Sequence, residues 1–262
     1  MTRPAERFPA GTFTPSPGRG QLGQMLARQS GVELRLALRN GEQVLLTLLI
    51  PLALLVGLTL LNVVPLPQPR VAMVAPGVFA LAVMSTAFTG QAIALGYDRR
   101  YGVIRRLAAT ALPRWLLVAG RLVAVLGAVA IQMIVLGTVA LTLGWRPAVG
   151  GLAWAVVLLL LGCAAFGGLG ILLGGTLRAE IVLAVANVVW FVLLLGGGIV
   201  LPVDQLPGSI GTVAALLPSG ALAEGLRTSL VSGQPPGLGP VLVLVGWAAV
   251  SGVLAARTVR LR

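Results

Sequence analysis

Six long apolar runs, separated by short polar segments, dominate the pattern along the chain. The runs cover residues 43–64, 71–95, 115–143, 151–176, 181–201 and 238–256. A helix rises about 1.5 Å per residue, so each run can cross a hydrocarbon layer about 30 Å thick. Backbone polar groups in lipid must be satisfied within the segment, which favours helices over open strands. The pattern therefore predicts an all-α polytopic membrane protein with six transmembrane helices, occupying residues 43–257.

Residues 21–42, just before the first run, have an amphipathic pattern. Arg28, Arg35, Arg39 and Glu42 are spaced as one face of a helix. The part VELRLALR also alternates as a strand would, but an isolated strand leaves its edges unpaired. We therefore expect a helix lying in the membrane interface, with room for a break at Gly31.

The two ends of the chain lie outside the apolar runs and are predicted to be tails. Residues 1–20 are rich in Pro, Gly, Thr and Arg and lack the continuous apolar centre of a signal peptide. We expect them to form a disordered cytoplasmic tail. Residues 258–262 are expected to form a short cytoplasmic C-terminal tail.

The stretch YDRRYGVIRRLAATALPR lies between the second and third runs and is rich in arginine. It predicts a helix over 98–113, with Asp98 as the acid at its N-terminus and Pro113 at its end. The simplest interpretation is a positively charged anchor that contacts anionic lipid. Its length and its start and stop signals favour a docking helix instead.

A second long polar segment, 202–237, separates the last two runs. Its prolines and glycines break it into short pieces, so we expect short helices before span six. One piece, ALLPSGALAEGLRTSLV, is apolar enough to lie on or dip into the outer leaflet.

All 19 basic residues are arginines, and the net charge is +12. With the N-terminus inside, sixteen arginines fall in cytoplasmic segments, and Arg70, Arg146 and Arg227 fall outside. This asymmetry predicts a multi-pass protein with both termini in the cytoplasm. No basic segment carries interleaved aromatic residues, so nucleic acid is not an expected partner. The lysine-free composition, rich in Ala, Gly, Leu, Val and Arg, is typical of a bacterial protein from a high-GC genome.

Several kinds of chemistry are excluded by missing residues. Without lysine there is no P-loop, and without histidine there is no Ser-His-Asp triad and no His-based zinc site. The seven acidic residues are scattered, and none lies near the middle of a span. We expect no catalytic residues, no metal site and no cofactor on this chain.

The polar residues inside the runs are expected to make hydrogen bonds between helices. Gly170 and Gly174 form a GxxxG pattern typical of close helix packing. Cys163 is expected to be a small buried residue. Arg121, one or two turns into the third run, is expected to snorkel or to pair with an acid, with contact to an anionic cargo as the alternative.

The order of these motifs resembles the ABC-2 type membrane subunits of ABC exporters, such as the daunorubicin-resistance-type permeases. In that family an acid, a glycine, a short helix and a proline follow the second span. The matching residues here are Asp98, Gly102, Arg106, Leu107, Thr110 and Pro113. Arg39-Asn40 matches an arginine-asparagine pair before span one, and Leu217-Pro218 and Leu226-Arg227 match the segment before the last span. The resemblance extends over about residues 22–257.

The resemblance implies a permease subunit of an ATP-driven exporter in a bacterial plasma membrane. Residues 98–113 would be the coupling helix that seats in a separate ABC ATPase subunit. The residues implied in coupling are Asp98, Tyr101, Gly102, Arg105, Arg106 and Leu107. The interfacial helix, with Arg28, Arg35 and Arg39, would brace the same partner.

A working transporter would then contain two ATPase subunits, which bind ATP and Mg, and a second membrane subunit, identical or related. Its apolar spans favour a lipophilic cargo such as a drug, an antibiotic or a lipid. Two other functions stay open: an ATP-independent secondary carrier, and a membrane-embedded assembly factor or enzyme.

Overall fold

The computed structural model describes residues 21–61, 68–109, 113–199 and 208–258. Every regular element in these ranges is a helix. The predictions for residues 1–20 and 259–262 lie outside the described residues, as do those for 62–67, Thr110 and 200–207.

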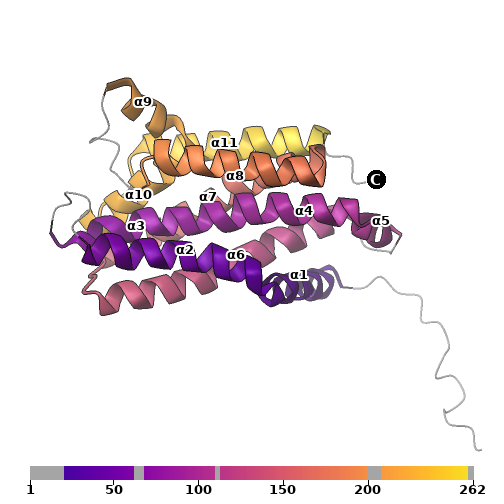
Figure 1. The fold of residues 1–262 in the computed structure, drawn as a ribbon, viewed down its shortest axis with the longest axis horizontal. Coiled ribbons are helices and arrows are strands. Elements are labelled where there is room, and N and C mark those ends of the chain that lie inside the picture. The colour runs from indigo at the N-terminus through magenta and orange to yellow at the C-terminus, as the bar shows by residue number, and fades with distance from the viewer. Residues whose placement is uncertain (1–20, 62–67, 110–112, 200–207, 259–262) are drawn as a thin grey trace, which may run out of the picture.

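Among the described residues, six helical segments are long and apolar enough to cross a membrane, as the sequence predicted, and one bent helix pair also passes this test when its two helices are taken together. They are α2 (Gly41–Leu60), the continuous α3–η1–α4, α6 (Arg114–Thr142), α7 (Leu152–Thr176), α8 (Ala179–Gly196) and α11 (Leu238–Thr258). A short 3₁₀ turn, η2 (Val149–Gly151), leads into α7. The six segments run along the long axis of the molecule (Figure 1). The all-helical polytopic fold is therefore confirmed.

The second span is the central helix of the bundle. It comprises α3 (Arg70–Val83), the π-helix η1 (Met84–Gly90) and α4 (Gln91–Arg100). Its apolar window is 83% buried, against at most 39% in the other five spans. A Cβ added at Gly174 of α7 would lie 2.4 Å from the carbonyl oxygen of Ala92. The GxxxG pattern therefore brings α7 against α4 within one chain, which confirms packing as its role.

Hydrogen bonds cross the bundle near the π-helix. Trp190 Nε1 of α8 donates to Ser85 Oγ at 2.9 Å, and Thr86 Oγ1 donates to Gln132 Oε1 of α6 at 2.9 Å. Gln132 Nε2 donates in turn to the carbonyl oxygen of Thr47 in α2 at 3.3 Å. These residues make the helix–helix hydrogen bonds that were predicted from the polar positions inside the spans.

The segment before the first span is the helix α1 (Leu22–Arg39), which is continuous through Gly31. The strand alternative and the break at Gly31 were therefore wrong. α1 ends at Arg39 because Asn40 begins α2, so Glu42 belongs to α2 and not to the basic face of α1. α1 lies against α6, where a Cβ at Gly120 would be 2.7 Å from Gln29 Cγ.

The segment between α8 and α11 contains two helices, α9 (Gly208–Leu216) and α10 (Pro218–Ser232), which meet at an angle of 88°. Pro218 opens α10, and Gly233, with φ +70°, ends it. Most of α10 is buried among the spans, since small residues such as Gly220, Ala221 and Gly225 allow close packing. Of the two predicted placements, this burial does not fit a helix lying on the membrane surface, whereas a bent helix pair is compatible with a segment that dips into the membrane.

The helix predicted over 98–113 was also wrong in its bounds. The second span continues through Asp98 to Arg100, and the chain leaves the helical conformation at Gly102, whose φ is +69°. The chain turns at Gly102, and only α5 (Val103–Ala108) follows. Asp98 therefore lies in the last turn of a long helix and does not cap a new one.

Candidate functional site

The candidate site is the arginine-rich turn between α4 and α6, at the end of the molecule that also carries α1 (Figure 1). Gly102 has φ +69°, a conformation that glycine adopts without the steric cost of a side chain. Its N–H donates to the carbonyl oxygen of Arg99 at 3.2 Å, and its own carbonyl accepts from the N–H of Arg106 at 3.2 Å. This glycine therefore ends one helix and starts the next within a single turn.

The predicted coupling residues divide between two sides of this turn. Tyr101 is 62% exposed, and Arg106 is exposed and donates to the carbonyl oxygen of Tyr101 at 3.2 Å. Ile104 is buried, and Leu107, which is partly buried, lines an internal cavity. The side chain of Arg105 lies outside the described residues. The outer surface of the turn is thus made by Tyr101 and Arg106, and Leu107 belongs to its inner side.

Asp98 also points inward and belongs to a cluster of three charged groups. It forms an ion pair with Arg121 Nη2 of α6, and Arg121 Nε lies 3.8 Å from Glu33 Oε1 of α1. The three side chains are 28%, 13% and 20% exposed, in the order Asp98, Arg121, Glu33. The cluster therefore joins α1, α4 and α6 at the root of the turn, and the paired state predicted for Arg121 is confirmed.

Sequence reasoning missed Glu33. It lies four residues after Gln29, whose Nε2 donates to Glu33 Oε1 at 3.1 Å. It is also an acid on a helix whose other charged residues are arginines. A single acid among the arginines of this helix was the signal that could have marked Glu33, whereas its pairing with Arg121 depends on how α1 packs against α6.

Two arginines at the end of α4 bind to residues at the end of α7 and the start of α8. Arg99 Nη1 donates to the carbonyl oxygens of Gly174 and Leu177 at 3.0 and 3.1 Å, at the C-terminal end of α7. Arg100 forms an exposed ion pair with Glu180 at the start of α8. Arginine is favourable at a helix C-terminus because it satisfies the last carbonyls and the helix dipole.

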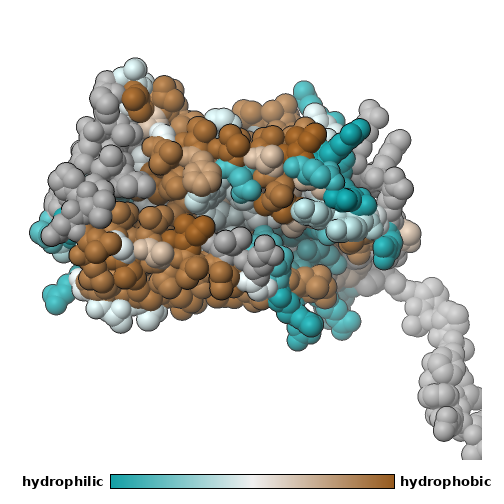
Figure 2. All heavy atoms as spheres, in the orientation of Figure 1, coloured by the Kyte–Doolittle hydropathy of each residue, from teal (hydrophilic) through white to brown (hydrophobic). Residues whose placement is uncertain are grey.

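The arginines predicted to brace a partner, Arg28, Arg35 and Arg39, are all exposed on α1. These arginines lie on α1, which packs against α6, whereas the turn lies between α4 and α5. The two groups are therefore at the same end of the molecule but on different helices. Hydrophilic side chains gather mostly at this end, and hydrophobic ones cover the middle of the molecule (Figure 2).

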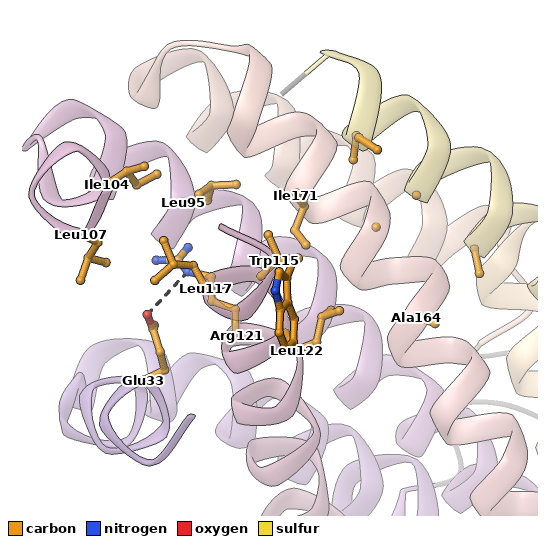
Figure 3. A pocket seen from close by; sticks show the side chains of 17 residues that line it. Glu33, Leu95, Ile104, Leu107, Trp115, Leu117, Arg121, Leu122, Ala164 and Ile171 are labelled. Atoms are coloured by element: carbon orange, nitrogen blue, oxygen red, sulfur yellow. Dashed lines mark ion pairs between the residues drawn. The ribbon is translucent and has the colours of Figure 1, made fainter. Parts of the chain in front are cut away.

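A cavity of about 730 Å³ lies behind the turn. Its walls come from α1, α4, α5, α6, α7 and α11, and most of its lining side chains are apolar (Figure 3). Glu33 and Arg121 are the charged residues among those that line it. Within the described residues, no group of three His, Cys, Asp or Glu side chains could hold a metal ion.

The opposite end of the molecule has a buried arginine whose position the sequence did not reveal. Arg227 of α10 is 5% exposed, and its Nη2 donates to the carbonyl oxygens of Gly198 and Ile199, each at 2.8 Å. Its Nη1 lies 3.5 Å from Glu224. Arg227 therefore connects α10 by hydrogen bonds to the residues that directly follow α8.

Together, the six spans, the exposed helical turn and the buried helix α10 define a multi-pass helical membrane protein. The family model of the ABC-2 type transporter matches residues 24–231, and the chain belongs to that family. A Bacillus subtilis (strain 168) protein named "Putative transport permease YvfS" is 25% identical over 230 residues. That match covers 85% of this chain and 92% of the relative.

Proposed function

We propose that this chain is the permease subunit of an ATP-driven exporter that moves a lipophilic cargo across a bacterial plasma membrane. A separate ABC ATPase would bind ATP and Mg and would dock on the turn at Tyr101 and Arg106. Two ATPase subunits and a second membrane subunit, identical or related, would complete the transporter. The termini, α1 and α5 would face the cytoplasm.

One observation carries this proposal: the turn is exposed on one side and, on the other, is connected to the two spans α4 and α6 and to the helix α1. Tyr101 and Arg106 offer an aromatic ring and a guanidinium to a partner, the residue types that dominate protein interfaces. Asp98 lies one turn from Tyr101 and pairs with Arg121, which also faces Glu33. A displacement of the turn would therefore move α4 directly and would act on α6 and α1 through the charged cluster.

Co-purification tests the proposed partnership. The tagged chain is extracted from its native membrane in mild detergent, and the eluate is assayed for a stoichiometric ATPase subunit and for ATP hydrolysis. Arg106→Glu should reduce retention of the ATPase at least tenfold, because it reverses the charge of the exposed surface. Arg257→Glu, at the exposed end of α11, makes the same charge change outside the turn and should retain the partner.

Coupling is tested separately from binding with Gly102→Pro. Proline fixes φ near −65° and lacks the N–H that bonds to Arg99, so it cannot reproduce the turn. We expect insertion into the membrane to persist and cargo-stimulated ATP hydrolysis to disappear. Gly144→Pro is the matched control, since Gly144 also has a positive φ, +89°, and donates to a carbonyl three residues earlier, at the other end of α6.

An eluate without any ATPase subunit would contradict the proposal, as would unchanged coupling in Gly102→Pro. In the first case the turn would be a lipid anchor, and cargo movement driven by an ion gradient in ATP-free vesicles would identify a secondary carrier.

A further inference from the structure

Helix α1 has an exposed side that is both basic and apolar. Arg28, Arg35 and Arg39 are exposed and are spaced seven and four residues apart, so they follow one face of the helix. Val32 and Leu36 are 56% and 61% exposed, and each lies three or four residues from one of these arginines. At the end of the molecule that carries α1, hydrophilic and hydrophobic side chains therefore lie next to one another (Figure 2).

The charge of these three arginines is not neutralised by any acid that the structure describes. Glu42 belongs to α2, and its side chain lies outside the described residues. The four acidic side chains that are described form ion pairs with arginines of other helices: Glu33 and Asp98 with Arg121, Glu180 with Arg100, and Glu224 with Arg227. The exposed side of α1 is therefore a place where an external anion can bind.

The C-terminal end of α1 lies where the chain enters the membrane. Asn40 ends α1 and begins α2, and the apolar run of α2 starts at Val44, about 6 Å further along. The spans follow the long axis in Figure 1, whereas α1 is seen foreshortened, so it crosses their direction. A basic and apolar helix in this position lies in the membrane interface, with its charged groups among the lipid headgroups.

The arginine-rich turn is farther from the middle of the bundle than the junction of α1 and α2. Gln43, in the first turn of α2, lies beside the second span, because a Cβ at Gly90 would be 2.7 Å from Gln43 Nε2. From there α4 continues for ten residues to Arg100, which is about 15 Å. Arg39 is therefore nearer to the lipid around α2 than to a partner that is seated on the turn.

Acidic phospholipids have the chemistry that this side of α1 fits. A guanidinium donates paired hydrogen bonds to a phosphate, and basic residues at a membrane surface are attracted to lipids with a net negative charge. Apolar side chains beside them are buried among the acyl chains. A soluble protein partner would leave that apolar stripe at the edge of the membrane, so the stripe favours lipid as the occupant.

We propose that the exposed side of α1 is a binding surface for acidic phospholipid. Arg28, Arg35 and Arg39 hold the phosphate groups, and Val32 and Leu36 contact the acyl chains. The inference goes beyond the proposed function and does not depend on an ATPase partner.

Spin-labelled lipids test this proposal on the purified chain in phosphatidylcholine vesicles. Electron paramagnetic resonance measures the fraction of a trace lipid that the protein immobilises, for phosphatidylglycerol and for phosphatidylcholine. We expect the chain to prefer phosphatidylglycerol at least about fivefold, the contribution of one basic residue at an anionic surface. Arg28→Gln/Arg35→Gln/Arg39→Gln should lower the preference to about twofold or less.

Arg146→Gln/Arg178→Gln/Arg257→Gln is the matched control, since it removes the same charge from exposed positions outside α1 and should keep the preference. Replacing the three arginines of α1 by lysine keeps the charge and should keep most of it. For the unaltered chain, the preference should fall in high salt, because exposed charges are screened. Inorganic phosphate should displace no more lipid than chloride at equal ionic strength, because it cannot contact the apolar stripe.

Equal immobilisation of the two lipids by the unaltered chain would overturn the proposal. An equal loss of preference in the two glutamine variants would do so too, because the effect would then follow net charge and not α1. If the α1 variant keeps its lipid preference but no longer retains an ATPase, the surface belongs to a protein partner. Displacement of the lipid by inorganic phosphate would assign it to a soluble anion. If the α1 variant does not fold, a preference of the unaltered chain that persists in high salt would contradict the proposal.

Discussion

Arg121 joins three helices, α1, α4 and α6, at the end of the bundle that carries the arginine-rich turn. Its sequence position allowed either a structural pair or a contact with cargo, and the structure shows the pair with Asp98. A guanidinium that is 13% exposed requires acidic partners, because an unpaired charge away from water is costly. The two acids come from helices distant in sequence, so no spacing rule could have identified them.

Replacing Arg121 should destabilise the protein more than replacing either acid. Arg121→Gln leaves Asp98 and Glu33 partly buried without a counter-charge, and we expect a loss of about 3 kcal/mol in the free energy of unfolding. The measurement is thermal unfolding in detergent micelles. The double variant Arg121→Gln/Asp98→Asn should recover part of that loss, and additive losses would show that the pair does not stabilise the fold.

Arg227 has the corresponding structural role at the opposite end of the bundle. Arg227→Met keeps an apolar stem but removes both hydrogen bonds to the carbonyls of Gly198 and Ile199. Hydrogen bonds to charged groups contribute about 1.5–3 kcal/mol each, so we expect a loss of at least about 2 kcal/mol by the same unfolding measurement. Arg146→Met, at an exposed outer position, should leave stability unchanged. Equal effects of the two variants would argue against a fastening role for Arg227.

At the scale of the elements, the apolar runs predicted each span to within a few residues of its observed ends. An apolar run of this length forms a helix in lipid, because its backbone N–H and C=O groups must form hydrogen bonds within the run itself. That requirement depends on the local sequence alone. The errors occurred where helices end. α4 runs past Asp98 because its last turn is stabilised by Arg99 and Arg100, whose partners lie on α7 and α8. α10 is buried because small residues fit it among the spans, a fact of tertiary packing that composition does not reveal.

The contact between α1 and α6 gives a test of packing at this scale. A Cβ at Gly120 would lie 2.7 Å from Gln29 Cγ, and one at Gly127 would lie 3.0 Å from Leu34 Cδ2. Gly120→Leu should therefore push α1 away from α6, at a cost of about 1–3 kcal/mol. We expect faster tryptic cleavage after Arg28 and Arg35 of the purified protein in nanodiscs.

Gly137→Leu is the matched control for that experiment. Gly137 lies on the same helix, and an added Cβ there would meet nothing within 4 Å. Cleavage of this variant should proceed at the rate of the unmodified protein. Equal acceleration by both variants would show that α1 is released by a general loss of stability and not by the lost contact.

At the scale of the whole molecule, the charged groups divide by end and by depth. Exposed arginines of α1, the turn and the end of α11 gather at one end, which the arginine count predicts to be cytoplasmic. The arginine count could predict which segments share this end, since it needs only the order of spans. The cavity and the cluster of Glu33, Asp98 and Arg121 could not be predicted, because they depend on how α1, α4 and α6 approach one another.

Orientation itself can be tested with introduced cysteines at exposed positions that carry no charge. The natural Cys163 is buried in α7 and is first replaced by alanine. Tyr101→Cys then places a thiol on the turn, and Val149→Cys places one at the other end, where the native side chains are 62% and 80% exposed. In intact spheroplasts, a membrane-impermeant maleimide should label Val149→Cys and should leave Tyr101→Cys unmodified until the membrane is permeabilised. Labelling in the reverse order would place the turn outside, where no cytoplasmic ATPase could reach Tyr101 and Arg106.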